Sequence, residues 1–245
     1  MKTLVIIPSR LSATRLPGKP LLKINGLSII SHVVKKAESA NIGEVYVATE
    51  DKEIMDDVNK NGGQSILTSN NHKTGTDRVY EAFKKIGKRD IKLIMNLQGD
   101  EPLMNIEDIR NLHNQMIKTK SKLGTLASKI EDKNLLGEEN VVKVVTKESL
   151  NNSQYPEAIN FTRKANNQSE NIYHHLGIYC YQQETLENFV SLSQSPNEIK
   201  NRLEQLRALD NNIKINVSLA KESSIGIDTE KDFMAIKKIM EYKSK

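Results

Sequence analysis

The chain has 245 residues with a formal net charge of +5, and 37% of its residues are hydrophobic, 27% charged and 4% aromatic. This balance is typical of a folded globular protein with a sizeable core and excludes a disordered chain. The single cysteine, Cys180, excludes a disulfide framework and a zinc site built from cysteines. No apolar run approaches the roughly 20 residues of a membrane span, so we expect a cytoplasmic protein without a signal peptide or a membrane partner.

The first half of the chain alternates short apolar runs with amphipathic segments. Strands are predicted over residues 4–7, 45–48, 64–68 and 93–97, and helices over residues 29–39, 51–61 and 77–85. Strands that alternate with helices in this way indicate an α/β fold with a doubly wound, mostly parallel sheet.

From about residue 124 the pattern changes, because the early strands are no longer separated by full helices. Strands are predicted over residues 125–130, 141–146, 158–162 and 176–181. We interpret residues 124–182, approximately, as a small mixed or antiparallel extension of a single domain that spans residues 1–245. A helix is predicted over 196–209, a strand over 213–218 and a closing helix over 229–242, where Thr229 and Asp232 have the spacing of a capping box.

The loop after the first strand carries the most informative residues. Arg10, Arg15 and Lys19 lie within residues 8–20, next to Gly18. Guanidinium groups bind phosphate oxygens in pairs, lysine adds a point charge and glycine lets the main chain approach closely. Because open α/β sheets bind ligands at strand ends, we interpret the loop as a polyphosphate cradle rather than a solvated basic loop. It is not a Walker A motif, in which the lysine precedes Ser or Thr.

Two carboxylates are candidates for a metal site beside this loop. Asp100 follows the predicted strand 93–97, and Asp228 precedes the final helix. Mg²⁺ is often bound by one or two carboxylates together with phosphate oxygens. We therefore predict that Asp100 and Asp228 bind Mg²⁺. The alternatives are a turn aspartate that accepts local amide bonds and a partner for the helix dipole.

The positive charge also raises the alternative of a nucleic-acid-binding protein. The lysines are scattered through mixed-sign segments, and the chain has 4 Phe, 7 Tyr and no Trp. Stacking platforms for single strands are therefore scarce. A solvated lysine-rich surface explains the charge better, so we expect no nucleic-acid partner.

A series of short blocks resembles the sugar-acid cytidylyltransferase family, and closely its 3-deoxy-manno-octulosonate (Kdo) branch. The blocks run in the family's order through nearly the whole chain, and include RLPGKP at 15–20, GTDR at 75–78, NLQGDEP at 96–102, VKVV at 142–145, HLGIY at 175–179 and LEQLR at 203–207. The resemblance implies a fold like that of nucleotide-diphospho-sugar transferases and a homodimer. It also implies transfer of CMP from CTP to the anomeric hydroxyl of Kdo, with Mg²⁺ as cofactor and release of pyrophosphate, for lipopolysaccharide biosynthesis.

The resemblance also implies roles for individual residues. The implied catalytic set, in which the cations hold the CTP phosphates and the carboxylates hold Mg²⁺, is Arg10, Arg15, Lys19, Asp100 and Asp228. The other implied nucleotide-binding residues are Ala48, Thr49, Ser69, Thr76 and Arg78. The implied sugar-acid contacts are Arg78, Gln98, Arg163, His175, Tyr181, Glu204 and Gln205. A guanidinium suits the sugar carboxylate, and Arg163 is our candidate for that contact.

Several of these positions also have a structural interpretation. His174 and His175 are neighbours in a predicted strand, so their side chains point to opposite faces and at most one is expected to reach a substrate. Glu204 and Gln205 lie in a predicted helix, where an exposed polar pair is ordinary.

The identity of the acceptor stays open. After Arg163 the chain reads Lys164-Ala165-Asn166-Asn167, whereas the family continues with Ile-Pro and an aromatic residue. This segment borders the expected sugar side. Kdo, 8-amino-Kdo and another nonulosonic acid of the sialic type are all consistent with the residues, so a CMP-sialic-acid synthetase is the competing enzyme.

Overall fold

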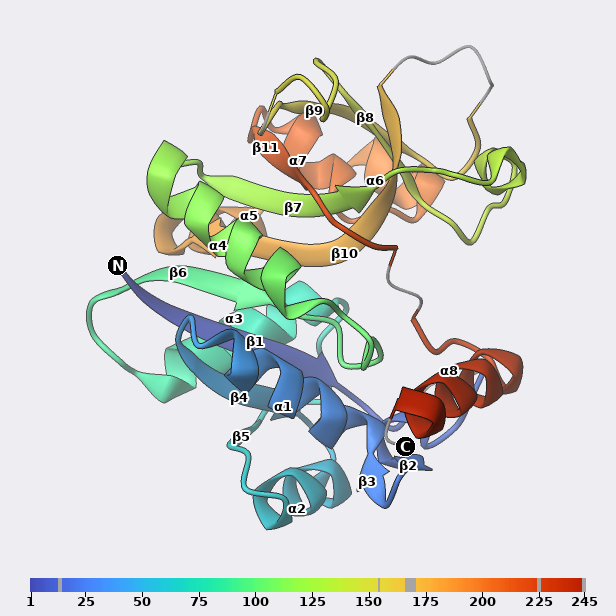
Figure 1. The fold of residues 1–245 in the computed structure, drawn as a ribbon. Coiled ribbons are helices and arrows are strands. Elements are labelled where there is room, and N and C mark those ends of the chain that lie inside the picture. The colour runs from blue at the N-terminus through green and yellow to red at the C-terminus, as the bar shows by residue number, and fades with distance from the viewer. Residues whose placement is uncertain (13–14, 154, 166–170, 224–225, 244–245) are drawn as a thin grey trace. The chain divides into compact units, whose positions relative to one another are not determined.

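The computed structural model describes residues 1–12, 15–153, 155–165, 171–223 and 226–243. The chain divides into two compact units (Figure 1). The first unit consists of residues 2–106 and 224–245, and the second consists of residues 107–223 with Met1. The prediction of a single domain with an extension at about 124–182 stays a prediction. The point near residue 124, where alternating strands and helices were predicted to give way to strands alone, falls inside the second unit.

The first unit is built on parallel strands in the order β5-β4-β1-β6. These strands are β1 (Lys2–Ser9), β4 (Glu44–Thr49), β5 (Ser65–Leu67) and β6 (Ile91–Asn96). The helices that connect them are α1 (Ile29–Ala40), α2 (Lys52–Lys60) and α3 (Gly75–Ile86). Figure 1 shows α1 in front of the strands and α3 behind them, so the predicted doubly wound arrangement is confirmed for this unit.

Local sequence explains where these elements start. The central strand β1 is apolar and buried from Leu4 to Ile7, as a strand covered on both faces must be. Ser28 caps α1 by accepting the N–H of Ser31 at 3.2 Å. Thr74 caps α3 by accepting the N–H of Asp77 at 3.1 Å. Each hydroxyl satisfies one main-chain donor that the first helical turn leaves unpaired.

The first unit is completed by a small antiparallel pair and the last helix, none of which lies in the main sheet. These elements are η1 (Lys19–Leu21), β2 (Lys23–Ile24), β3 (Leu27–Ser28) and α8 (Glu230–Lys243). Ile227 and Ile236 pack with Ile24 in one buried cluster, which attaches α8 to the segment after the basic loop. The predicted capping box is confirmed, because Asp232 N donates to Thr229 Oγ1 at 3.2 Å and Thr229 N donates to Asp232 Oδ2 at 2.8 Å.

The second unit has mixed strands. β10 pairs antiparallel with β7 and β8, β8 pairs antiparallel with β9, and β7 pairs parallel with β11. Its strands are β7 (Leu123–Ser128), β8 (Lys143–Thr146), β9 (Ala158–Thr162), β10 (Ile172–Gln182) and β11 (Ile215–Leu219). Its helical segments are α4 (Ile106–Thr119), η2 (Lys133–Leu136), α5 (Gln183–Ser191), α6 (Pro196–Asn201) and α7 (Leu206–Asp210). The predicted mixed and antiparallel character of this part is confirmed.

Two features of the second unit differ from the sequence-based prediction. The helices α4 and α5 were not predicted. The predicted single helix 196–209 is interrupted, because Arg202 adopts a left-handed conformation with φ of 54°. The break is stabilised by Arg207, whose guanidinium donates to both carboxylate oxygens of Glu198 at 2.6 and 2.8 Å in a buried ion pair. Glu204 and Gln205 therefore lie in the turn between α6 and α7 and not within a helix.

Candidate active site

The basic loop leaves the carboxyl end of β1 and closes on itself through its main chain. Gly18 N donates to Leu11 O at 3.3 Å, and Gly18 has a left-handed φ of 69° that favours glycine at this position. Lys19 follows as the first residue of η1. The loop therefore brings Arg10, Arg15 and Lys19 to one end of the parallel strands, as predicted.

The acidic side of the site comes from the loop after β6 and the segment before α8. Gly99 packs so closely on β1 that a β-carbon there would lie 3.0 Å from Pro8 O. This close approach holds Asp100 beside the exit of β1. Ile227 N donates to Asp100 O at 3.0 Å and thereby places Asp228 next to it. Asp228 reaches the site from the start of the last helix, not from a strand end.

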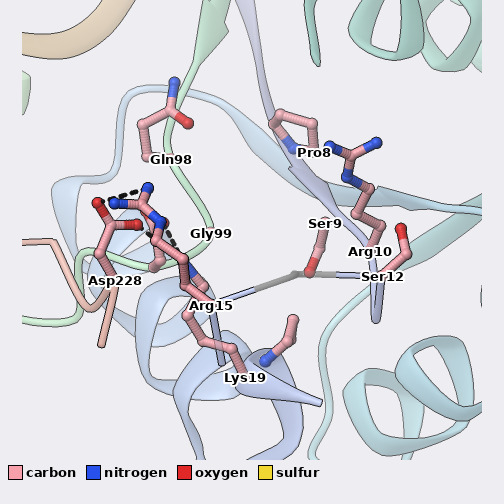
Figure 2. Close-up of a pocket in the computed structure, with 11 residues that line it drawn as sticks. Pro8, Ser9, Arg10, Ser12, Arg15, Lys19, Gln98, Gly99 and Asp228 are labelled. Carbon is pink, nitrogen blue, oxygen red and sulfur yellow. Dashed lines mark hydrogen bonds and ion pairs between the residues drawn. The ribbon is translucent and has the colours of Figure 1, made fainter. Parts of the chain in front are cut away.

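These loops enclose a cavity of about 360 Å³. Figure 2 shows Arg10 and Ser12 on the right of the cavity and Arg15 and Asp228 on the left. The residues that line the cavity are Pro8, Ser9, Arg10, Ser12, Arg15, Lys19, Pro20, Gln98, Gly99, Asp100 and Asp228. All five predicted catalytic residues and the predicted sugar contact Gln98 thus line one cavity in the first unit.

Cations and carboxylates in the cavity pair with each other. Lys19 Nζ lies 2.6 Å from Asp100 Oδ2 and 3.6 Å from Asp228 Oδ1, and Arg15 Nη2 lies 3.0 Å from Asp228 Oδ2. Because one ammonium group contacts both carboxylates, the two carboxylates are neighbours. Among the described residues Arg10 has no ion pair.

The donor set fits a hard divalent cation that shares its ligands with a polyphosphate. The described residues contain no cluster of three or more His, Cys, Asp or Glu side chains that would bind a metal without help. Two neighbouring carboxylates, however, are the usual protein share of a Mg²⁺ site whose remaining ligands are phosphate oxygens and water. Asp100 and Asp228 therefore fit the predicted role.

The predicted nucleoside-side residues lie at the exits of β4 and β5 and at the start of α3. The side chains of Ala48 and Thr49 are fully buried, and Thr76 is buried as well. Ser69 N donates to the carboxylate of Glu81 at 2.9 Å, which fixes the loop after β5. Burial by itself would raise the pKa of Glu81, but the bonds from Lys85, Ser69 and His72 outweigh it and lower this pKa to about 2. None of the predicted nucleoside-side residues lines the cavity described above.

Arg78 is held by protein groups. Its guanidinium pairs with Glu50 and donates to Thr68 Oγ1 at 2.6 Å and to Ser69 O at 3.3 Å. The side chain is 4% exposed. Arg78 therefore fixes the turn after β4 to the loop after β5, and its predicted contact with both substrates stays a prediction.

In the second unit, the buried His175 and Tyr181 belong to a row of rings on β10. His175 Nε2 lies 3.0 Å from Thr125 Oγ1, and its ring is 5.5 Å from that of Tyr179, which is 6.0 Å from Tyr181. Burial lowers the pKa of His175 to about 3, so its imidazole is neutral at physiological pH. His174 contacts Ser223 instead, at 2.8 Å, so the two histidines have different environments, as predicted.

Tyr179 is a member of this row that the sequence analysis missed. Burial raises the pKa of its hydroxyl well above the ordinary value, and the charge of Glu204 acts in the same direction. The strand alternation contained the signal, because residues 175, 179 and 181 have the same parity. His175, Tyr179 and Tyr181 therefore form one row of aromatic rings in this unit.

Arg163 has several main-chain partners in the structure. Its guanidinium donates to the carbonyl oxygens of Glu139, Asn201 and Arg202, each at 3.0 Å. Arg163 O in turn accepts from the ammonium group of the fully buried Lys143 at 2.5 Å. These bonds attach the end of β9 to the start of the turn that carries Glu204 and Gln205. Binding of a sugar carboxylate by Arg163 stays a prediction.

Comparison with known proteins places this arrangement in a family. The cytidylyltransferase family matches residues 4–215. A 3-deoxy-manno-octulosonate cytidylyltransferase of Nitrobacter winogradskyi is 40% identical over 241 residues, which cover 98% of this chain and 94% of that protein. The chain belongs to the 3-deoxy-manno-octulosonate cytidylyltransferase family. Another member, from Thermodesulfovibrio yellowstonii, is 41% identical over 98% of both chains.

Solved structures agree with this family membership. A structure of CMP:2-keto-3-deoxy-manno-octonic acid synthetase complexed with CTP has a TM-score of 0.89 and 33% identity, and covers 99% of this chain and all of that chain. A UDP-glucose pyrophosphorylase complexed with UDP-glucose has a TM-score of 0.73 and 14% identity over both complete chains. The second likeness concerns the fold alone and confirms that this chain has the fold of nucleotide-sugar transferases.

Proposed function

We propose that this chain transfers the CMP group of CTP to the anomeric hydroxyl of 3-deoxy-D-manno-octulosonate and releases pyrophosphate. The observation that carries the proposal is the cavity at the exits of β1 and β6, where Arg10, Arg15 and Lys19 meet Asp100 and Asp228. The named relatives and the related synthetase complexed with CTP support the choice of donor and acceptor.

The cations of the cavity bind and orient the triphosphate in this proposal. Phosphoryl and nucleotidyl transfer needs an attacking oxygen in line with the leaving group, so catalysis depends on positioning and on neutralising charge. Arg10 and Arg15 present guanidinium groups that match phosphate oxygens. Lys19 adds an ammonium charge on a side chain that is 13% exposed. Charge that develops on the departing pyrophosphate is stabilised by these groups.

A divalent metal, which we propose to be Mg²⁺, would be held by Asp100 and Asp228 together with phosphate oxygens. When bound, such a cation neutralises phosphate charge and polarises the phosphoryl group. The contribution of the protein is the pair of adjacent carboxylates at one wall of the cavity, kept together by the bond from Ile227 N to Asp100 O.

Polar groups of the second unit are proposed to bind hydroxyls of the acceptor. A sugar acid offers many hydroxyls and one carboxylate. Neutral His175, Tyr181, Gln205 and the carboxylate of Glu204 supply hydrogen-bond donors and acceptors for hydroxyls. Because the pKa of His175 is lowered to about 3, this imidazole serves as a neutral hydrogen-bonding group and not as a cation.

Pyrophosphate release across a panel of nucleotides and sugar acids tests the proposal. We expect turnover with CTP and Kdo, little with ATP, GTP or UTP, and a requirement for a divalent metal. Turnover with a sialic acid and none with Kdo would overturn the choice of acceptor. Turnover with 8-amino-Kdo in preference to Kdo would identify 8-amino-Kdo as the acceptor. This alternative is open because residues 164–167 differ from the family's usual sequence.

Homodimerisation, a cytoplasmic location and a place in lipopolysaccharide assembly are further proposals that rest on the family membership. Within the described residues, each helix is too short or too polar to span a bilayer. Light scattering tests the oligomeric state, and complementation of a strain that lacks this activity tests the biological role. Salt-dependent nucleic-acid binding that persists in a protein with Arg15→Ala and Asp100→Asn would instead favour the nucleic-acid alternative.

A further inference from the structure

The turn after β4 contains an aspartate, Asp51, whose carboxylate bonds to a distant loop and not to the helix that it precedes. Asp51 occupies the N-cap of α2 with an extended main chain, at φ −96° and ψ 120°. An aspartate in this position ordinarily accepts a hydrogen bond from an N–H of the first helical turn. Within the described part of the chain, the side chain of Asp51 caps no N–H of α2. Its Oδ2 instead accepts the main-chain N–H of Leu11 at 2.7 Å.

This bond reaches the phosphate cradle. Leu11 lies 40 positions before Asp51 in the sequence, between Arg10 and Ser12, and both of these neighbours line the cavity. The carbonyl of Leu11 accepts the N–H of Gly18 at 3.3 Å. Both main-chain polar groups of Leu11 are therefore fixed, one inside the loop and one by Asp51.

The turn that carries Asp51 is itself attached to the core. Asp51 N donates to Thr49 Oγ1 at 3.1 Å, and Thr49 is fully buried at the end of β4. Met55 N donates to Asp51 O at 3.2 Å, which ties the turn to α2. A hydrogen bond to an ionised acceptor is stronger than one between neutral groups. Asp51 therefore ties the loop at Leu11 to the end of β4 and to α2.

Resting on the proposed function, we propose that Asp51 is a positioning residue that holds Arg10 in the orientation that receives the CTP triphosphate. Arg15 and Lys19 are oriented by ion pairs with carboxylates. Arg10 has no ion pair among the described residues, so its orientation depends on the main chain that carries it. Loss of the anchor at Leu11 weakens CTP binding and leaves the affinity for the acceptor unchanged.

The variant Asp51→Ser separates this role from helix capping. Serine caps helices well, but its hydroxyl lies one bond closer to the main chain and does not reach Leu11. We expect the Kd for CTP from calorimetry and the KM for CTP each to rise roughly tenfold. The KM for the sugar acid stays within about twofold. Asp51→Asn keeps an acceptor oxygen at the same reach and restores the CTP affinity to within about threefold of the unaltered chain.

The matched control is Asp132→Ser. Asp132 is the N-cap of η2, and its Oδ1 accepts Asn134 N at 2.9 Å. We expect its CTP affinity to be unchanged. An unchanged CTP affinity in Asp51→Ser would overturn the proposal, and so would an Asp51→Asn protein as weak as Asp51→Ser, or an equal rise in both KM values. An unaltered chain that binds no CTP would overturn the proposed function itself, so the two failures are distinguishable.

Discussion

The ammonium group of Lys19 lies 2.6 Å from Asp100 Oδ2 and 3.6 Å from Asp228 Oδ1, so one cation joins the two carboxylates of the cavity. The Lys19 side chain is 13% exposed, and solvent screens such a pair less than a surface pair. In the proposed function, phosphate oxygens would compete for Lys19 and a divalent cation would compete for the carboxylates. We therefore expect the pair to link binding of the nucleotide to binding of the metal.

Replacing Lys19 by methionine removes a cation from the proposed phosphate cradle. It also removes the ion pairs of Lys19 with Asp100 and Asp228. We expect the KM for CTP to rise at least roughly tenfold, because a charge-assisted bond to phosphate is lost. Mg²⁺ binding to the protein alone is expected to tighten. Calorimetric titration with Mg²⁺ and with CTP measures both effects, with the exposed Lys35→Met as control. A weaker Mg²⁺ affinity in Lys19→Met would contradict the competition.

Replacing Asp100 by asparagine keeps the size of the side chain and removes its charge. We expect kcat to fall roughly hundredfold or more, since a metal contributes several kcal/mol of transition-state stabilisation. Pyrophosphate release at increasing Mg²⁺ concentrations measures the loss and the raised metal requirement. The exposed Asp56→Asn on α2 is the control and is expected to retain full activity. Full activity of Asp100→Asn at ordinary Mg²⁺ would rule out a metal role for this carboxylate.

Replacing Arg163 by alanine removes the three bonds from its guanidinium to main-chain carbonyls. We expect the KM for the sugar acid to rise roughly tenfold, because the turn with Glu204 and Gln205 loses its attachment. The KM for CTP stays within about twofold. Arg163→Lys is expected to rescue little, because an ammonium group cannot reproduce the planar fork of the guanidinium. Steady-state kinetics with each substrate varied in turn tests this, and an equal rise in both KM values would argue against it.

Acidification is expected to destabilise the protein through His175. The pKa of His175 is lowered from 6.5 to about 3 by burial, so the unfolded chain binds this proton first as the pH falls. The contribution of His175 to the free energy of unfolding is therefore fully present above about pH 6.5 and is lost toward pH 3. The loss is about 2 kcal/mol between pH 7.5 and 5.

Urea unfolding at pH 7.5 and 5 measures this dependence. Between pH 7.5 and 5, the free energy of unfolding of His175→Gln is expected to fall by about 2 kcal/mol less than that of the unaltered chain. The control is His32→Gln, which removes a partly buried histidine whose Nε2 lies 2.8 Å from Ile24 O. An equal pH dependence in His175→Gln and the unaltered chain would show that other groups cause the loss. Glu81, with a pKa lowered from 4.5 to about 2, contributes stability that is lost in a more acidic range, as the pH falls from 4.5 to 2.

The alternation of strands and helices in the first unit, and the grouping of three cations after the first strand, could be predicted from the amino-acid sequence. Both signals are local. The run from Leu4 to Ile7 reads as a buried strand because no polar residue interrupts it. The grouping of Arg10, Arg15 and Lys19 reads as an anion site because like charges are costly to place together without a ligand. The same locality explains why the capping box of Thr229 and Asp232 was predicted correctly.

Which of these groups come into contact could not be predicted from local sequence patterns. Asp228 lies more than a hundred positions from Asp100 in the sequence, and the bond from Ile227 N to Asp100 O brings the two together. The break after α6 depends on the buried pair of Arg207 and Glu198, which helical periodicity does not reveal. The use of Asp51 as an anchor for Leu11 is likewise invisible in the sequence, where an aspartate before a helix reads as a cap. Local patterns encode which residues are present, whereas long-range hydrogen bonds and ion pairs decide what each side chain does.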